Sequence, residues 1–318
     1  MNLDDLRVLR DAIAGEIEKA VQGQKHVIEH LLVSLFARGH CLLEGPPGTA
    51  KTLLAQSLSS ALSLEFKRIQ FTPDLMPGDV IGSNIYDFGA HRFQLVKGPV
   101  FTDILLADEI NRAPPKTQAA LLQVMNERRV TIDGVDHRVG NMFFTIATQN
   151  PIEQQGTYPL PEAQLDRFLF KLVLDFPSEE AEFSILSRHA LQALDHDARR
   201  AAITPVAGLA ELQSAQQLVD SIRLDETILR YVLSLARATR NDADIAYGVS
   251  TRAADALCGA VRARAALHGR DYAIPDDVKT LFVPAMRHRI VLSPSAEIDG
   301  RDPVGVLEAL LDQVEAPR

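Results

Sequence analysis

A turn rich in glycine and proline places a lysine and a threonine where phosphate groups could bind. The stretch reads CLLEGPPGTAKTLLA, and its apolar ends predict a strand before the turn and a helix after it. Backbone N–H groups of such a loop, together with the helix N-terminus, form a cradle for phosphates. Lys51 could bridge the outer phosphates, and the Thr52 hydroxyl could be a ligand of Mg²⁺. The loop residues predicted to bind nucleotide are Gly45, Pro46, Pro47, Gly48, Thr49, Ala50, Lys51, Thr52 and Leu53.

This loop departs at one position from the strict phosphate-loop pattern, which has glycine directly before the lysine. That position is Ala50 here. Glycine is favoured where φ is positive or where the backbone touches phosphate. Alanine in a left-handed conformation costs only about 1–2 kcal/mol, and the loop tolerates this more easily than the loss of Lys51. We therefore expect the loop to bind nucleotide in spite of Ala50.

A second candidate element is the apolar run ILLADEIN, which ends in Asp108 and Glu109. Carboxylates at the end of a buried strand are costly unless a cation or a hydrogen-bond partner meets them. Asp108 could hold the Mg²⁺ that bridges the phosphates. Glu109 could orient an attacking water and accept its proton. Together, the loop and the acidic strand end predict hydrolysis of ATP or GTP.

Asn150 follows the apolar run FFTIATQ and is a further candidate. An amide at the carboxyl end of a strand, near the phosphates, could position the attacking water. The alternative interpretation is a turn residue before Pro151.

These residues have to be positioned by strands that alternate with helices. Residues 1–37 have the apolar spacing of two helices, and the pattern 115–128 is also helical. Short apolar runs bounded by turn residues predict strands at 41–44, 66–71, 103–108, 141–149 and within 167–176. This alternation predicts an α/β fold with a parallel sheet. Two hairpins interrupt it: 84–96, with a turn at Gly89–Ala90, and 128–139, with a turn at Asp133–Gly134.

After Phe176 the pattern becomes almost purely helical, for example over 226–240 and 251–267. A chain of 318 residues is long enough for two domains. We expect residues 1–177 to form N-terminal helices and the nucleotide-binding core, and residues 178–318 to form a smaller all-α domain.

The composition and the absence of certain sequence patterns limit the expected cellular compartment and the expected classes of partner. The first residues lack the features of a signal peptide, no apolar run approaches the ~18 residues of a membrane span, and the two cysteines form no disulfide or zinc pattern. We therefore expect a cytoplasmic protein that does not insert into membranes. The formal net charge is −9 and there is no basic tail. Since non-specific nucleic-acid binding depends mainly on Lys and Arg, nucleic acid is not an expected partner.

The order of the motifs resembles that of an AAA+ ATPase: VQGQ, GPPGTAKT, ILLADEIN and then ATQNP. More narrowly, the chain is similar to the MoxR family in the blocks FTPDLMPGDVIGS, KGPVF, DEINRAPPKTQAALLQVMNER, GTYPLPEAQLDRFLFK and GVSTRA. The resemblance covers about residue 20 to about residue 290. The last block departs from the usual pattern, which more often has proline in place of Thr251, and Asp136 and Gly140 lie in a variable hairpin.

The resemblance implies a fold and an assembly. The fold would be a Rossmann-like αβα AAA+ core with a parallel sheet, plus a smaller α-helical lid. The activity would be Mg²⁺-dependent ATP hydrolysis in a homo-oligomeric ring, usually a hexamer. The role would be chaperone-like remodelling or maturation of other proteins, often partners with a von Willebrand factor A domain.

The resemblance also implies roles for individual residues. Arg167, in LDRF, matches the arginine finger that reaches the γ-phosphate in the neighbouring subunit, although the residue alone would suggest a salt bridge with Glu162 or Asp166. Arg252, in STR, matches a lid arginine that senses nucleotide, in its own subunit or in the next. Val21 and the residues up to Gln24 match the segment near the adenine. The insert 74–85 and the hairpin 130–138 match elements that face the ring pore or the partner.

Three alternatives remain open at this point. One is a nucleic-acid-dependent ATPase, because replicative helicases carry a similar loop. Another is a metal-chelatase-type motor subunit, which would need a separate partner. The third is a nucleotide-gated binding module with little turnover, against which Glu109 argues because a gate needs no carboxylate to activate water.

Overall fold

A five-stranded parallel sheet forms the centre of the protein. The computed structural model describes residues 1–89, 91–140, 142–151, 156–192 and 202–317. The strands are ordered β2 (Phe66–Gln70), β5 (Ile104–Asp108), β8 (Phe144–Gln149), β1 (Cys41–Glu44) and β9 (Phe170–Val173). Every residue of β5 is buried, as expected for a strand covered on both faces. The predicted α/β fold with a parallel sheet is confirmed.

Alternating side chains of the strands enter two separate hydrophobic clusters. Leu43 and Leu106 pack with the larger cluster, whereas Leu42 and Leu105 pack with the smaller one on the other face. The larger cluster contains residues of α1 (Leu3–Ala20), α2 (Lys25–Phe36) and α3 (Lys51–Ala61). The smaller one contains residues of α4 (Pro77–Ile81), the 3-10 helix η1 (Ile110–Arg112) and α5 (Pro115–Glu127). The sheet therefore lies between two layers of helices.

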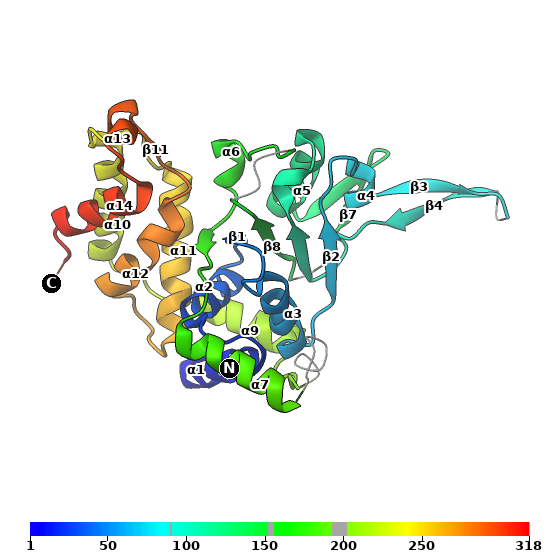
Figure 1. The fold of residues 1–318 in the computed structure, drawn as a ribbon, viewed down its shortest axis with the longest axis horizontal. Helices are drawn as coiled ribbons and strands as arrows, with labels where there is room; N and C mark the ends of the chain where they lie inside the picture. The colour runs from blue at the N-terminus through cyan, green and yellow to red at the C-terminus, as the bar shows by residue number, and fades with distance from the viewer. Residues whose placement is uncertain (90, 141, 152–155, 193–201, 318) are drawn as a thin grey trace.

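Two antiparallel hairpins extend from the core. The first is formed by β3 (Gly82–Asp87) and β4 (Arg92–Lys97), which project well away from the sheet (Figure 1). The second is formed by β6 (Arg129–Ile132) and β7 (Val135–Arg138), and Asp133 and Gly134 at its turn have φ of 48° and 81°. Both predicted hairpins are confirmed, although Ala90 of the first turn lies outside the described residues.

The second half of the chain is mostly helical. The elements are α6 (Glu162–Leu165), α7 (Glu179–Gln192), α9 (Leu209–Asp220), α10 (Glu226–Asn241), α11 (Thr251–Leu267), α12 (Pro275–Met286), α13 (Pro294–Ile298) and α14 (Pro303–Gln313). Figure 1 shows α10 to α14 gathered at one side as a lid, whereas α9 packs against α2. The lid also contains a small sheet of β10 (Ile245–Tyr247) and β11 (Val291–Leu292). Strands of three and two residues are too short to give an alternating sequence pattern.

The lid and the N-terminal helices share one hydrophobic cluster. Buried residues of α1 and α2 belong to the same cluster as those of α11 and α12. Gln216 of α9 donates a hydrogen bond from Nε2 to the carbonyl oxygen of Leu35 in α2, at 2.9 Å. The division into residues 1–177 and 178–318 stays a prediction. None of the helices in the described ranges is long and apolar enough to cross a membrane.

Candidate functional site

The glycine- and proline-rich loop connects the end of β1 to the beginning of α3, as the sequence predicted. Lys51 is the first residue of α3, and Ala50 directly before it has φ of 62°. Gly48 also has a positive φ, 85°. The position where the strict pattern has glycine is therefore a left-handed position, and alanine occupies it at a modest cost in strain. This geometry turns the chain so that the loop opens at the N-terminus of α3.

The Lys51 ammonium lies over the loop in this structure. It donates hydrogen bonds to the carbonyl oxygens of Gly45 and Pro46, both at 2.8 Å. The Thr49 hydroxyl also donates to Pro46 O, at 2.9 Å. Burial lowers the pKa of Lys51, while the charges of Asp108 and Glu109 oppose the shift. The charges of the nearby carboxylates therefore favour the protonated form of this lysine, which its predicted role as a phosphate ligand requires.

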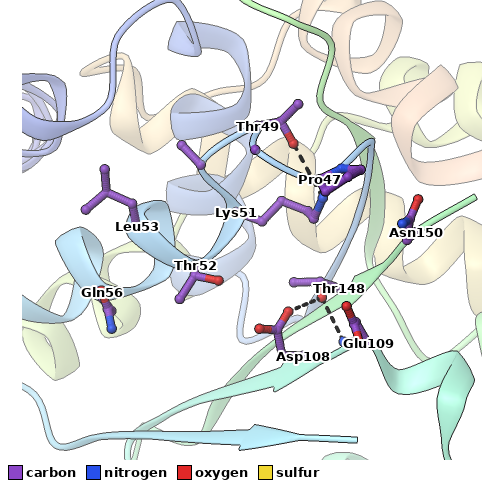
Figure 2. Close-up of a pocket in the computed structure, with 12 residues that line it drawn as sticks. Pro47, Thr49, Lys51, Thr52, Leu53, Gln56, Asp108, Glu109, Thr148 and Asn150 are labelled. Atoms are coloured by element: carbon purple, nitrogen blue, oxygen red, sulfur yellow. Dashed lines mark hydrogen bonds between the residues drawn. The ribbon is translucent and has the colours of Figure 1, made fainter. Parts of the chain in front are cut away.

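The loop and the acidic strand end line one cavity of about 410 Å³. This volume is in the range of small-ligand sites, ~300–1,000 Å³. Figure 2 shows the lining side chains, with Thr52 of α3 across from Asp108 of β5. The cavity is lined by Pro47, Gly48, Thr49, Ala50, Lys51, Thr52, Leu53, Gln56, Asp108, Glu109, Thr148 and Asn150.

Asp108 is held at the end of β5 by two partners. Its Oδ1 accepts a hydrogen bond from the Thr148 hydroxyl at 2.6 Å, and its Oδ2 is 2.6 Å from Nη2 of Arg68. The residue is only 7% exposed. The bonds from Thr148 and Arg68 offset the cost of burying this carboxylate.

The backbone leaves the strand direction at Glu109, and the Glu109 carboxylate contacts two side chains that Asp108 does not contact. The φ of Glu109 is 56°, and its backbone N–H donates to the Thr148 hydroxyl at 2.9 Å. Its Oε2 accepts a hydrogen bond from Gln70 Nε2 at 2.7 Å and lies 3.0 Å from Nε of Arg112. The carboxylate is thus oriented from β2 on one side and from η1 on the other.

Thr52 and Asp108 supply the type of ligand that Mg²⁺ prefers. Magnesium is usually held by one or two protein oxygens together with phosphate oxygens and water, not by a complete protein cage. A hydroxyl and a carboxylate that line the same cavity fit this pattern. The predicted pair of metal ligands is therefore compatible with the structure.

The two predicted arginines lie together in a second cavity. Arg167 donates from Nη1 to the carbonyl oxygen of Leu122 at 2.6 Å, and Arg252 donates from Nη2 to Oδ1 of Asn126 at 3.0 Å. This cavity measures about 340 Å³ and is rich in basic side chains. Its lining includes Arg38, His40, Asn126, Arg128, Asp166, Arg167, Arg252, Asp255 and Arg289.

The charges of this second cavity are close enough to affect one another. Burial and the positive charge of Arg252 lower the pKa of Arg167. Asp166, a partner that the sequence alone would suggest for Arg167, is paired instead with Arg289, at 2.9 Å between Oδ1 and Nε. Among the residues that the structure describes, those lining the first cavity include neither Arg167 nor Arg252. An arginine-rich cavity of this kind suits an anion.

Three residues that were predicted to bind nucleotide, Val21, Gly45 and Pro46, do not line the first cavity. Gly45 and Pro46 contribute carbonyl oxygens to Lys51 but are not among the lining residues. A Cβ at Gly45 would lie 2.5 Å from the carbonyl oxygen of Leu174, so glycine is required there by the close approach of the backbone directly after β9. Val21 is 2% exposed and packs in the larger hydrophobic cluster.

Four polar residues around the first cavity were missed by the sequence analysis. Thr148 and Gln56 line it, and Arg68 and Gln70 bond the two carboxylates. In the sequence of β2, the polar residues Arg68 and Gln70 alternate with the apolar Ile69, and this pattern could have indicated them. In the sheet, Gln70 lies in register with Asp108. The pattern identifies Arg68 and Gln70 as site residues only when the strand order is known, because that order places β2 beside β5.

Comparisons with known proteins show the family of the chain. Residues 40–170 match the ATPase family associated with various cellular activities (AAA), and residues 237–310 match the AAA lid domain. The chain is 40% identical to Chaperone MoxR1 of Mycobacterium tuberculosis, over 95% of this chain and 81% of that protein. It is 35% identical to Protein MoxR of Paracoccus denitrificans, over 91% and 90%. A solved structure of a Cytophaga hutchinsonii protein superimposes with a TM-score of 0.90 at 37% identity, over 99% of this chain and 97% of that chain.

Proposed function

The chain belongs to the MoxR family of AAA+ ATPases, and from this premise we propose that it hydrolyses MgATP in a ring and uses the cycle to remodel partner proteins. One observation carries the proposal. The phosphate loop and the acidic strand end share one cavity, while Arg167 and Arg252 share another. In a ring, each of these two cavities would supply one half of a hydrolytic site.

The first cavity would bind the triphosphate. The loop N–H groups and the N-terminus of α3 attract the phosphates, and Lys51 would exchange the carbonyl oxygens of Gly45 and Pro46 for phosphate oxygens. Thr52 and Asp108 would hold Mg²⁺, which neutralises part of the phosphate charge when it is bound. The segment from Val21 to Gln24 would lie near the adenine.

Glu109 would act on the attacking water. Gln70 and Arg112 orient its carboxylate, and the cavity places it beside the groups that hold the phosphates. As a general base it would accept the proton while the oxygen attacks the γ-phosphorus. Asn150, which lines the same cavity and is 8% exposed, would help to fix the position of the water.

Arg167 and Arg252 would act on the nucleotide of the neighbouring subunit. Their common cavity is distinct from the cavity of the phosphate loop, and so a second subunit would bring the two halves together. An arginine finger supplied in trans accelerates hydrolysis by about 10³–10⁵-fold. We propose a homo-oligomeric ring, most simply a hexamer, in which hydrolysis requires assembly.

Remodelling of proteins is supported by the β3–β4 hairpin. Tyr86, Phe88 and Phe93 cluster near its tip, and Tyr86 makes edge-on ring contacts with the other two. Phe88 is 82% exposed and Phe93 is 69% exposed. Exposed aromatic clusters of this kind usually mark interaction sites. The clients would be proteins, including those with a von Willebrand factor A domain, and the expected cytoplasmic location stays a prediction.

Mixed rings test this proposal. Glu109→Gln should bind ATP but turn it over slowly, and Arg167→Ala should bind ATP with its own cavity intact and also be inactive. In an equimolar mixture, about one quarter of the interfaces pair an intact cavity with an intact finger, so about a quarter of wild-type turnover should return. Steady-state ATPase measurements on the mixture and on each variant alone would show whether turnover returns.

Two results would contradict the proposal. Absence of recovery in the mixture would remove the trans role of Arg167. A several-fold increase of wild-type turnover by single-stranded DNA would indicate a nucleic-acid-dependent ATPase instead.

A further inference from the structure

The short segment Asp166–Phe168 carries the proposed finger, and two lid side chains hold its backbone. Nη2 of Arg289 donates hydrogen bonds to the carbonyl oxygens of Asp166 and Phe168, at 3.0 and 2.9 Å. Nε2 of His288 donates to the Phe168 carbonyl oxygen as well, at 2.9 Å. The backbone is therefore fixed on both sides of Arg167.

Arg289 also forms an ion pair with the side chain next to the finger. Its Nε is 2.9 Å from Oδ1 of Asp166, and its side chain is only 3% exposed. Burial lowers its pKa to about 10, and the charge of Asp166 opposes this shift. Arg289 is thus charged at neutral pH, and one planar group contacts two carbonyl oxygens and a carboxylate, which a lysine could not do in the same way.

Stability alone is a weak reason for such an arrangement. A buried ion pair commonly contributes little net stability, because desolvation of the two charges offsets their attraction. What the guanidinium provides is geometry, since its donors point in fixed directions. Here those directions determine the path of three residues whose central member is Arg167.

The groups that hold the segment belong to the lid. Arg289 lies just after α12, which packs against α11, and α11 carries Arg252. Arg167, Arg252 and Arg289 all line the second cavity. The tip of Arg167, in contrast, is bonded to the carbonyl oxygen of Leu122 in α5. The backbone of the finger is therefore tied to the lid, and its side chain is tied to the core.

We propose that Arg289 is a positioning residue for Arg167, through which the lid of one subunit sets the place of the finger offered to its neighbour. This inference rests on the proposed function, a ring with a finger that acts in trans. It adds a route by which lid movement in one subunit changes hydrolysis in the next.

The substitution Arg289→Met should lower kcat about 100-fold, the size expected when a transition-state group is misplaced by about 1 Å. The KM for ATP should change little, because the first cavity of the same subunit is untouched. Arg289→Lys, which keeps the charge without the fork, should fall between Arg289→Met and wild type. Arg301→Met is the matched control: Arg301 is a lid arginine paired with Asp244 at 2.8 Å, 55% exposed, and its variant should turn over ATP normally.

The decisive measurement mixes Arg289→Met with Glu109→Gln. The first variant keeps its cavity and the second keeps its finger, so about a quarter of wild-type turnover should return in the mixture. Recovery requires folded Arg289→Met subunits and thus excludes a merely structural loss. If that variant fails to fold, Asp166→Asn removes the same ion pair with less change in volume and should give the same recovery.

The mixing experiments distinguish the role of Arg289 from the trans role of Arg167 on which it depends. If Arg167→Ala recovers with Glu109→Gln but neither Arg289→Met nor Asp166→Asn does, Arg289 acts within its own subunit and only the inference is wrong. A wild-type kcat for Arg289→Met would also contradict the positioning role of Arg289. If Arg167→Ala itself shows no recovery, the trans finger is wrong and the role of Arg289 is wrong with it.

Discussion

At the scale of single residues, the Thr148 hydroxyl links the two carboxylates of the candidate site. It donates to Oδ1 of Asp108 and accepts from the backbone N–H of Glu109. A hydroxyl can do both at once, since it has one hydrogen and two lone pairs. Thr148 therefore fixes the relative orientation of the proposed metal ligand and the proposed base.

We expect Thr148→Val to lower ATP turnover about 10- to 100-fold, the usual effect of removing a group that orients a metal ligand. The substitution keeps the shape of the side chain and removes both hydrogen bonds. Steady-state ATPase rates at saturating MgATP measure the effect.

Thr145→Val is the matched control on the same strand. Thr145 is fully buried, and its hydroxyl has no hydrogen-bond partner in the part of the chain that the structure describes. Its variant should therefore keep wild-type turnover. Equal losses in the two variants would show that β8 tolerates no valine, and Thr148 would lose its special role.

The sequence predicted the site residues that carry a local pattern. Lys51 and Thr52 follow a glycine turn, and Asp108 and Glu109 end an apolar run, so each pair is recognisable without knowledge of its neighbours. Thr148 could not be predicted in this way, because its role depends on the place of β8 beside β5. The burial of Val21 likewise results from tertiary packing.

At the scale of elements, a network of charges connects α2 to the lid helices. Glu29 of α2 lies 3.3 Å from Nε of Arg264 and 3.1 Å from Nε2 of His268, both in or next to α11. Arg264 and Arg270 also pair with Asp277, whose side chain is fully buried in α12. The network thus holds three helices from both halves of the chain.

The Glu29 carboxylate should make stability depend on pH. The hydrogen bond from His268 and the charge of Arg264 lower its pKa from 4.5 to about 2, in opposition to burial. Because the folded-state pKa is the lower one, the contribution is complete above pH 4.5 and is lost as pH falls towards 2. It amounts to at most about 3 kcal/mol, at 1.36 kcal/mol per pKa unit.

Urea unfolding at several pH values measures this contribution. Glu29→Gln should be less stable than wild type at pH 7, and the difference should shrink between pH 4.5 and pH 2. The exposed Glu308, on α14, provides the control, and Glu308→Gln should show no such change. A difference for Glu29→Gln that is the same at pH 7 and pH 2 would mean that packing, not the charge, is responsible.

The existence of most elements followed from the sequence, but their arrangement did not. Apolar runs and turn residues identified the five strands of the sheet, and the Asp133–Gly134 turn identified a hairpin. Nothing local states that β9 pairs with β1 or that α9 packs on α2. Those contacts depend on surfaces distant in sequence, which only the folded chain brings together.

At the scale of the whole molecule, the β3–β4 hairpin projects well away from the sheet (Figure 1). Its base is braced by Asn84, whose Nδ2 donates to Oδ2 of Asp133 at 2.8 Å. The aromatic cluster near its tip is far from the contacts that hold the core. Changes at the tip should therefore separate partner binding from hydrolysis.

We expect Phe88→Ser combined with Phe93→Ser to keep basal ATPase activity and thermal stability, because both side chains are exposed. Stimulation of the ATPase by an added partner protein should be lost. Tyr247→Ser combined with Tyr272→Ser removes two exposed lid aromatics, 73% and 57% exposed, and should leave stimulation intact. If the hairpin variant responds to the partner like wild type, the hairpin is not the contact surface.

The packing of α1 against α11 has a consequence for biosynthesis. Leu6, Ile13 and Ile17 of α1 are buried, and α11 begins roughly 230 residues after α1 ends. A ribosome that adds about 5–20 residues per second needs roughly 10 to 50 s to supply that partner. During this interval the apolar side of the first helix made is not yet covered by α11, and only its earlier partners α2 and α3 are available to cover it.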